Sequence, residues 1–324
     1  MRYAMAAAKP GGSDVIRKIE LGAMSPSAEE VLIRHEAIGL NFLDIYIRNG
    51  AYPWPVETDL VLGSEGAGVI EAVGNNVKGV AVGDRVGYTL ANGAYASHRL
   101  IDARYVVKLP NNVSSELAAS IMLKGLTVAY LIHDSFRVES GHAVLFHAAA
   151  GGVGLIAGQW LNALGAKVIG TAGGADKCAL AKANGYHHVI DYKSADFEAE
   201  VMQLTDGKGV DVTYDSVGND TMARSLTSTR RHGTIIAFGQ SSGPYLDFKI
   251  TDLAKGSYKL SRPTLFHFVA EREWLEASAA KLFTAVTDGT LNISINQKYA
   301  LEDVAKAHDA LTGRATTGST ILTV

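Results

Sequence analysis

A glycine-rich run at residues 147–154 is the strongest chemical motif in the sequence; it reads His-Ala-Ala-Ala-Gly-Gly-Val-Gly. An apolar segment typical of a buried strand, 143–147, precedes it, and apolar residues at helical spacing follow it. A strand, a glycine-rich turn and a helix in this order form the phosphate-binding corner of dinucleotide-binding proteins, although an ordinary tight turn has the same outline. The flanking segments favour the dinucleotide site. We expect Ala150, Gly151, Gly152, Val153 and Gly154 to form the cofactor-binding turn. Ala149 stands where the first glycine of the motif is usual.

The segment after the next expected strand, 167–172, indicates which nucleotide is bound. A site for NAD usually places Asp or Glu at the end of this strand, but here Gly173 follows directly and Asp176 is expected to cap the next helix. The missing carboxylate removes a repulsion against a 2′-phosphate. Lys177 is placed to meet that phosphate, with Tyr192 nearby at the end of the following strand, although Lys177 also fits a solvated helix face. The sequence therefore predicts NADPH.

Composition narrows the class of protein. Thirty Lys and Arg against 33 Asp and Glu give a net charge of -3, which argues against a basic nucleic-acid surface. Cys178 is the one cysteine, so an intramolecular disulfide and a structural zinc on several thiolates are excluded. The adjacent pair His187 and His188 lacks a chelating spacing. Without an apolar leader or an uninterrupted apolar run of ~18 residues, we expect a cytoplasmic location and no membrane partner.

The element pattern divides the chain. The first 120 residues read as short strands separated by glycine turns, with helices expected only at 41–49 and 115–120. Strands and helices alternate between residues 143 and 238, which is typical of βαβ units in a doubly wound parallel sheet. The tail fits helices at 271–287 and 301–311 and a strand at 319–324, and we expect it to return to the first domain. The fold class is thus α/β with a second, β-rich domain.

The sequence resembles a known family. Residues 140–154 are similar to the signature of zinc-independent quinone oxidoreductases of the zeta-crystallin type, in the medium-chain dehydrogenase/reductase superfamily. Further segments that resemble this family are 41–52, 63–74, 83–86, 124–127, 238–243 and 261–265. The resemblance covers essentially the whole chain. It implies a GroES-like catalytic domain at 1–121 and 267–324 and a Rossmann cofactor domain at 122–266, with substrate between them.

The resemblance also indicates whether a catalytic zinc ion is expected. Zinc alcohol dehydrogenases of this superfamily hold catalytic zinc with two Cys and one His, and the matching positions here are Asn41, Ser64 and Lys124. These are not a zinc ligand set, and the cysteine-rich structural lobe is missing. We therefore expect no metal. A quinone suits such a site, because hydride transfer to it yields a charge-delocalised hydroquinone anion that needs no Lewis acid.

The remaining site residues follow from the same resemblance. Asn41 would flank the nicotinamide, and Tyr46 and Tyr52 would flank the quinone, either as hydrogen-bond donors or as an aromatic wall. Arg314 either reaches a cofactor phosphate or is a surface residue at a helix end. The other residues expected at the cofactor are Lys124, Thr127, Phe238, Gly239, Ser241 and Phe266.

The expected activity is NADPH-dependent reduction of quinones, by hydride or by single electrons. One alternative is reduction of an enone or enoyl thioester, for which Tyr52 could supply the proton. An alternative of another class is a nucleotide-gated RNA-binding or structural protein; nucleic acid is disfavoured by the acidic balance. By resemblance the chain forms a homodimer through an edge strand near residues 258–265.

Overall fold

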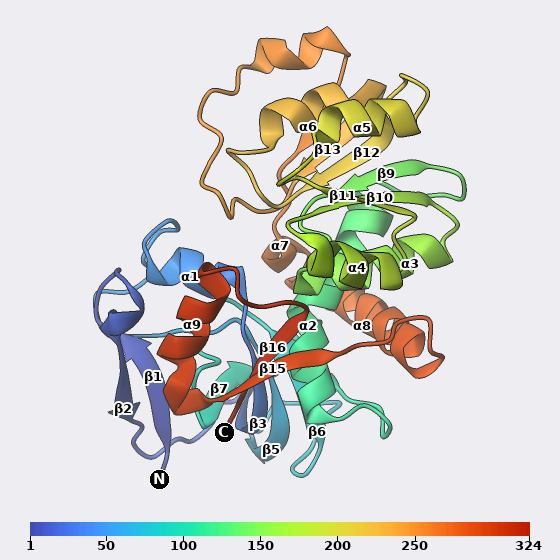
Figure 1. The fold of residues 1–324 in the computed structure, drawn as a ribbon. Coiled ribbons are helices and arrows are strands. Elements are labelled where there is room, and N and C mark those ends of the chain that lie inside the picture. The colour runs from blue at the N-terminus through green and yellow to red at the C-terminus, as the bar shows by residue number, and fades with distance from the viewer. The chain divides into compact units, whose positions relative to one another are not determined.

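The computed structural model describes residues 1–324 as two compact units. The first unit comprises residues 1–126, 266–287 and 293–324, and the second comprises 127–265 and 288–292. The α/β fold class expected from the sequence is confirmed, with a β-rich unit and a doubly wound unit (Figure 1). The division expected at residue 121 and the observed unit boundary at 126 both fall inside one helix, α2 (Ser115–Tyr130).

The first unit is built on strands. A seven-stranded sheet has the order β15-β16-β3-β5-β6-β8, with β7 also pairing with β3, and a three-stranded sheet has the order β2-β1-β4. The strands are β1 (Tyr3–Ala7), β2 (Ile16–Glu20), β3 (Glu30–Gly39), β4 (Leu60–Val61), β5 (Glu65–Val73), β6 (Arg85–Thr89), β7 (His98–Asp102), β8 (Val106–Lys108), β15 (Ile295–Ala300) and β16 (Ser319–Thr323). Its helices are α1 (Phe42–Arg48), most of α2, α8 (Arg272–Thr287) and α9 (Val304–Thr312), with the short α7 (Leu265–Val269) at its boundary.

The second unit is a parallel sheet with the order β11-β10-β9-β12-β13-β14. Helices α3 and α4 lie on one face and α5 and α6 on the other (Figure 1). In chain order the elements are β9 (Ala143–Phe146), α3 (Gly152–Ala163), β10 (Lys167–Ala172), α4 (Ala175–Ala183), β11 (His188–Asp191), α5 (Phe197–Leu204), β12 (Val210–Asp215), α6 (Met222–Ser228), β13 (Thr229–Ala237) and β14 (Lys259–Ser261). The chain reverses its winding direction between β9 and β12, which is where ligands bind in such sheets.

Two expectations about elements need correction, and one strand was not expected. Helix α2 is far longer than the expected 115–120 and ends in a π-helical turn, Leu131–Ser135. Tertiary burial explains its length, since the stretch Ser115–Ser135 is apolar enough to span a membrane by composition, yet 83% of its most apolar window is buried in the protein. Strand β15, which the sequence analysis did not identify, alternates half-buried and exposed residues. Asp176 does not cap α4, because the N-cap is Gly174 and Asp176 lies in the first turn.

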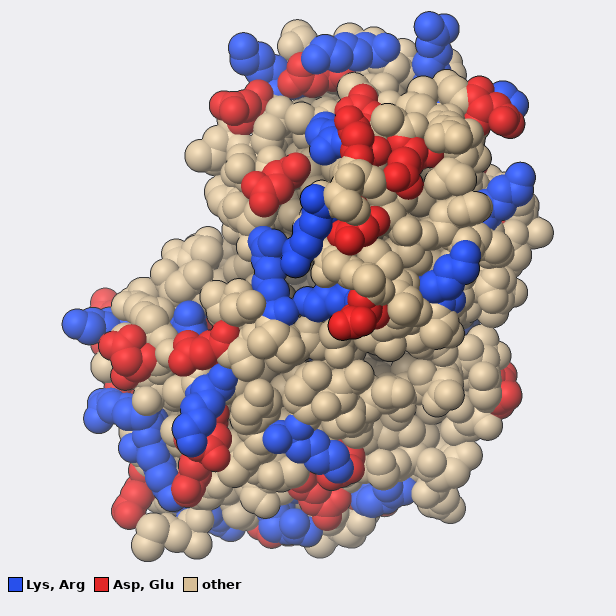
Figure 2. All heavy atoms as spheres, viewed as in Figure 1, with Lys and Arg blue, Asp and Glu red and all other residues tan.

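Charge is distributed without a dominant sign. Figure 2 shows acidic and basic side chains interspersed over the face in view, among a larger uncharged surface. This distribution agrees with the small net charge of -3. It offers no extended basic face on that side of the kind that nucleic-acid binding requires.

The core of the first unit contains a buried histidine–tyrosine pair. His35 on β3 and Tyr88 on β6 are 2% and 0% exposed. Nδ1 of His35 lies 2.6 Å from the carbonyl oxygen of Ala96, so it carries the proton, and Nε2 accepts from the Tyr88 hydroxyl at 2.7 Å. Burial lowers the pKa of His35 to about 3, which keeps the ring neutral.

We expect Tyr88→Phe to lower the free energy of unfolding by about 1–2 kcal/mol, because the buried Nε2 of His35 loses its donor. Urea denaturation followed by circular dichroism measures the change. The exposed Tyr192→Phe serves as the control and should leave the midpoint unchanged. Equal stability of Tyr88→Phe and the parent chain would contradict the assigned hydrogen bond.

Candidate functional site

Most of the residues expected at the cofactor lie at the carboxyl edge of the parallel sheet. All the expected cofactor residues of the second unit other than Thr127 follow the ends of β9, β10, β11 or β13. These residues are Ala150, Gly151, Gly152, Val153, Gly154, Gly173, Lys177, Tyr192, Phe238, Gly239 and Ser241. Thr127 is buried in α2. Parallel strands end at a common edge, so the sequence segments that were singled out separately converge.

The glycine-rich turn has the geometry of a phosphate site. Gly151 is the N-cap of α3 and offers no side-chain cap, so the first-turn amide N–H groups have no capping partner and can bind an anion. A Cβ on Gly154 would lie 2.4 Å from the carbonyl oxygen of Ala148, which makes glycine necessary there. The helix therefore packs directly against the strand, as the sequence motif predicts.

The departure from the usual glycine motif has a structural compensation. Ala149 is fully buried, and its amide N–H bonds to the carbonyl of Thr171 on β10 at 2.9 Å. A Cβ on the neighbouring Gly170 would lie 2.7 Å from the Ala149 methyl group, so the missing side chain on β10 makes room for the alanine. The positive φ falls instead on Ala148, at 56°.

The end of β10 has no carboxylate, as the sequence indicates, but the end of β11 has one. Asp191 accepts hydrogen bonds from the amides of Gly174 and Lys193, at 2.9 and 3.0 Å, and these bonds lower its pKa. Its carboxylate thereby orders the turn before α4. Lys177 lies half-buried in the first turn of α4, and the Tyr192 hydroxyl lies where a Cβ on Gly173 would be, at 2.5 Å. This donor set fits a phosphorylated nucleotide.

In the first unit, a buried carboxylate joins two of the expected site residues. Glu65 is 0% exposed, and its Oε1 accepts from Nδ2 of Asn41 at 2.9 Å and from Nζ of Lys124 at 2.5 Å. Oε2 accepts from the amide of Leu123 at 2.7 Å. A Cβ on Gly39 would lie 2.1 Å from Oε1, so glycine on β3 makes room for this carboxylate.

Glu65 was missed by the sequence analysis, although it directly follows Ser64, one of the positions matched to zinc ligands. Ser64 itself donates to Asp44 at 2.6 Å. The positions matched to zinc ligands thus present an amide, a hydroxyl and an ammonium that is already paired with a carboxylate. A zinc ion does not fit these donors, because an ammonium has no lone pair to give. No group of three or more His, Cys, Asp or Glu in the chain could hold a metal ion.

Tyr46 and Tyr52 form one aromatic surface next to α1. Their ring centroids are 5.5 Å apart in an edge-to-face arrangement, and the amide of Tyr52 donates to the carbonyl of Tyr46. Phe42, one helical turn before Tyr46, extends this surface with a centroid distance of 6.1 Å. Sequence reasoning did not single out Phe42, although its i, i+4 spacing to Tyr46 was a usable signal.

Two further expected residues also lie in the first unit. Phe266 is half-buried in the short helix α7. Arg314 is exposed after α9 and has a positive φ of 58°.

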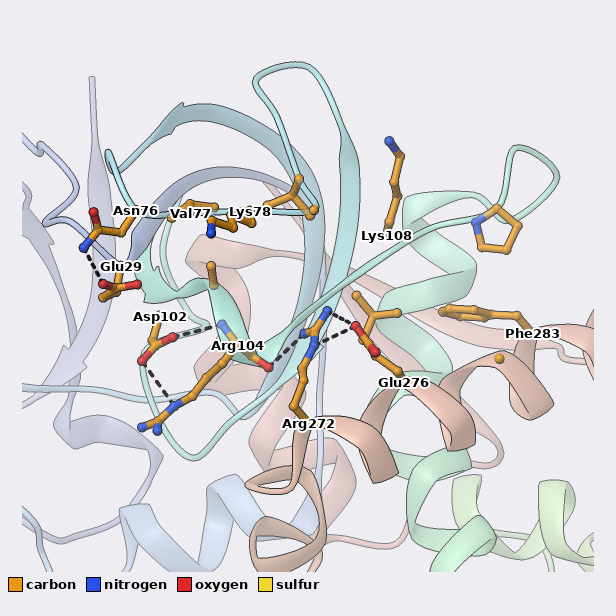
Figure 3. A pocket seen from close by; sticks show the side chains of 16 residues that line it. Glu29, Asn76, Val77, Lys78, Asp102, Arg104, Lys108, Arg272, Glu276 and Phe283 are labelled. Atoms are coloured by element: carbon orange, nitrogen blue, oxygen red, sulfur yellow. Dashed lines mark hydrogen bonds and ion pairs between the residues drawn. The ribbon is translucent and has the colours of Figure 1, made fainter.

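One cavity in the first unit, of about 590 Å³, is unrelated to these residues. Figure 3 shows that two of its arginines have acidic partners: Arg104 contacts Asp102, and Arg272 contacts Glu276. Arg272 also donates to the carbonyl oxygens of residues 104 and 106, which fastens α8 to the strand unit. These interactions give both arginines a structural role.

Comparisons with known proteins agree with this geometry. Residues 27–111 match the alcohol dehydrogenase GroES-like domain, and residues 152–280 match the family described as zinc-binding dehydrogenase. A quinone oxidoreductase of Pseudomonas aeruginosa is 44% identical over 314 residues, covering 96% of each chain. A 2-haloacrylate reductase of Burkholderia is 40% identical, covering 97% of this chain and 96% of the relative. The crystal structure of Escherichia coli quinone oxidoreductase complexed with NADPH is 41% identical, with a TM-score of 0.97 over 99% of this chain and 100% of that one.

The buried pair of Lys124 and Glu65 generates a stability prediction. We expect Lys124→Met or Glu65→Gln alone to lower the free energy of unfolding by about 3–5 kcal/mol, because each leaves the other group charged and buried. The double variant should lose much less than the sum, which a double-mutant cycle by chemical denaturation measures. The exposed pair Lys298 and Glu116 is the matched control, and Lys298→Met should cost under about 1 kcal/mol. Additive losses at Lys124 and Glu65 would contradict the coupling.

A second prediction concerns pH. Burial raises the pKa of Asp44 to about 6, against the opposing hydrogen bonds from Ser64 and Tyr95. The folded chain thus holds this proton more tightly than the unfolded chain, so the contribution of Asp44 to stability is greatest below its ordinary pKa and declines as pH rises through about 6.

We therefore expect the difference in unfolding free energy between the parent chain and Asp44→Asn to fall from about pH 4 to about pH 7, with a slope of at most about 1.4 kcal/mol per pH unit. Denaturant titrations at a series of pH values measure it. The exposed Asp220→Asn is the control. A difference independent of pH would show that Asp44 does not titrate in this range.

Proposed function

The chain belongs to the quinone oxidoreductase family of the medium-chain dehydrogenases/reductases, and from this premise we propose that it reduces quinones with NADPH and without a metal. The observation that most supports the proposal is the ion pair between Glu65 and Lys124, because Lys124 stands at one of the positions matched to zinc ligands. An ion pair occupies the place of a Lewis acid. The acceptor must then be one whose reduced form stabilises its own charge, as a hydroquinone anion does.

The second unit would bind the cofactor. The uncapped N-terminus of α3 would hold the pyrophosphate through amide N–H groups, and Lys177 with Tyr192 would recognise the 2′-phosphate. We also assign Gly173, Phe238, Gly239 and Ser241 to this unit's cofactor surface and Thr127 to the nicotinamide end. NADPH, when bound, supplies the reducing equivalent. The proposed cofactor domain, 122–266, overlaps this unit for most of its length, and the proposed catalytic domain comprises 1–121 and 267–324.

The first unit would position the acceptor. Asn41 and Lys124 are held by one carboxylate and would lie at the nicotinamide end, with Phe266 and Arg314 as further cofactor contacts. Tyr46 and Tyr52 would form the wall for a planar acceptor, since their edge-to-face packing presents an aromatic surface. Catalysis would then consist mainly of positioning two reactants.

A second activity is reduction of an activated carbon–carbon double bond. The resemblance to a 2-haloacrylate reductase favours it as the alternative, because that relative is 40% identical over nearly the whole chain. Such a reaction needs a proton donor at carbon, for which Tyr52 is a candidate. A quinone reaction lacks this requirement, so the two activities respond differently to loss of one hydroxyl.

Assembly and location complete the proposal. We propose a homodimer formed through β14, the edge strand of the parallel sheet. Leu246 and Ile250, which are 83% and 78% exposed in the segment before β14, are apolar surface that such an interface would cover. A cytoplasmic location is supported by the single cysteine.

The discriminating experiment measures NADPH consumption with quinones, enones and enoyl thioesters, for the parent chain and for Tyr52→Phe, with a metal chelator throughout. With a simple quinone, kcat of Tyr52→Phe should stay within about tenfold of the parent, because the hydroxyl contributes little to the transition state. Tyr105→Phe, in another part of the same unit, is the control. A thousandfold loss of kcat with intact NADPH affinity would make Tyr52 an acid and favour the enone reaction. Loss of turnover in chelator would overturn the metal-free proposal.

Nucleotide preference gives a separate prediction. Lys177→Ala should weaken NADPH binding by about 1–3 kcal/mol, the range for one charged hydrogen bond, and leave NADH binding unchanged. Fluorescence titration of both nucleotides measures this. Lys182→Ala, on the exposed side of the same helix, is the control and should change neither affinity. Parallel losses for both nucleotides would contradict recognition of the 2′-phosphate by Lys177.

A further inference from the structure

Four buried polar side chains lie on α1 or against it, and the proposed reaction does not use them. Asp44 and Arg48 are one helical turn apart on α1 and are 0% and 6% exposed. Tyr95, from the loop before β7, and His308, on α9, are both 0% exposed. We call the set of Arg48, His308, Tyr95 and Asp44 the α1 clamp.

Hydrogen bonds connect the clamp from end to end. The Arg48 guanidinium lies 3.1 Å from Nδ1 of His308, Nε2 of His308 lies 2.9 Å from the Tyr95 hydroxyl, and that hydroxyl lies 2.8 Å from Oδ2 of Asp44. Both ends of this chain of bonds are therefore on α1, and both middle members are on other elements.

The donor inventory fixes the direction of every bond. A guanidinium can only donate, so Nδ1 of His308 accepts and Nε2 carries the proton of the neutral ring. The Tyr95 hydroxyl oxygen accepts a hydrogen bond from Nε2–H of His308, and the hydroxyl proton is donated to Oδ2 of Asp44. Burial and the nearby Arg48 lower the pKa of His308 to about 3, so the ring stays neutral. The bonds run in one direction, from a buried cation to a buried carboxylate.

The helix that the clamp holds is too short to orient itself. Helix α1 has seven residues, well below the length at which an isolated helix is stable in water. Its position must come from tertiary contacts. At its start, Oδ2 of Asp44 also accepts from the amide of Asn41 at 2.9 Å, and on its outer side it presents Tyr46 to Tyr52.

We propose that Tyr95 and His308 are positioning residues for the acceptor, acting through Asp44 and Arg48 to hold Asn41 and Tyr46 in place. This inference rests on the proposed function, which assigns those two residues to the site. Tyr95 and His308 are fully buried, so they act on substrate only through α1. Their loss should loosen acceptor binding more than it slows the chemical step.

The test uses a matched pair of tyrosines. Tyr95→Phe and Tyr88→Phe each remove one buried hydroxyl that bonds a buried histidine in the same hydrophobic core, but only Tyr95 belongs to the α1 clamp. We expect Tyr95→Phe to raise KM for 1,4-benzoquinone about fivefold or more, roughly the factor of one hydrogen bond, with kcat within about twofold and an unchanged Kd for NADPH. Tyr88→Phe should lose comparable thermal stability and leave KM within about twofold.

His308 supplies a second comparison. His308→Gln keeps one donor and one acceptor, whereas His308→Leu removes both, so glutamine should retain most of the parent KM and leucine should raise it. If His308→Leu does not fold, Tyr95→Phe against Tyr88→Phe decides alone. A KM for Tyr95→Phe that moves no more than that of Tyr88→Phe, or equal changes in KM, kcat and NADPH affinity, would overturn the positioning role.

The parent chain separates this inference from the proposed function. If the parent consumes NADPH with enones and not with quinones, the quinone proposal fails and the same four variants are compared with an enone. Binding of 1,4-benzoquinone is also measured without turnover, by fluorescence titration of the nucleotide-free chain. A weaker Kd in Tyr95→Phe and not in Tyr88→Phe supports the α1 clamp whichever acceptor is reduced.

Discussion

Burial of charge in the first unit sets the conditions that the rest of the site must meet. Glu65 and Asp44 are both fully buried, and a carboxylate removed from water is stable only when donors and opposite charge surround it. Glu65 accepts hydrogen bonds from the side chains of Lys124 and Asn41. Asp44 accepts hydrogen bonds from Ser64, from Tyr95 and from the backbone amide of Asn41. Asn41 belongs to both sets. The proposed contact with the nicotinamide is therefore fixed by two carboxylates at once, one on its side chain and one on its backbone.

The two units solve the problem of placing polar groups in different ways. In the parallel sheet, strand ends bring backbone amides and glycine turns to one edge, and little side-chain chemistry is needed. In the strand-rich unit, buried side chains from β5, α1, α2 and α9 form the polar core. Hydrogen bonds and one ion pair organise this polar core.

The sequence was a good guide wherever local rules decide structure. The turn at Gly151 and Gly154, the parallel sheet and the family could all be predicted, because periodicity and a short motif encode them. The contribution of Glu65 could not be, since nothing local says that a carboxylate at the start of β5 meets Lys124 on α2. His308 is a stronger case. It lies 260 residues from Arg48, and only tertiary folding brings these two side chains within hydrogen-bond distance.

The order of elements in the first unit bears on how the chain acquires its structure. Strand β16, made of residues 319–323, pairs with β3, made of residues 30–39, and α9 brings His308 to the core built by the first hundred residues. During synthesis, the second unit has almost all of its residues available while the first still lacks a strand neighbour and the partner of Tyr95. Until β16 and α9 are synthesised, side chains of the N-terminal strands that are buried in the folded unit stay exposed. We expect chaperones to bind these strands during that interval.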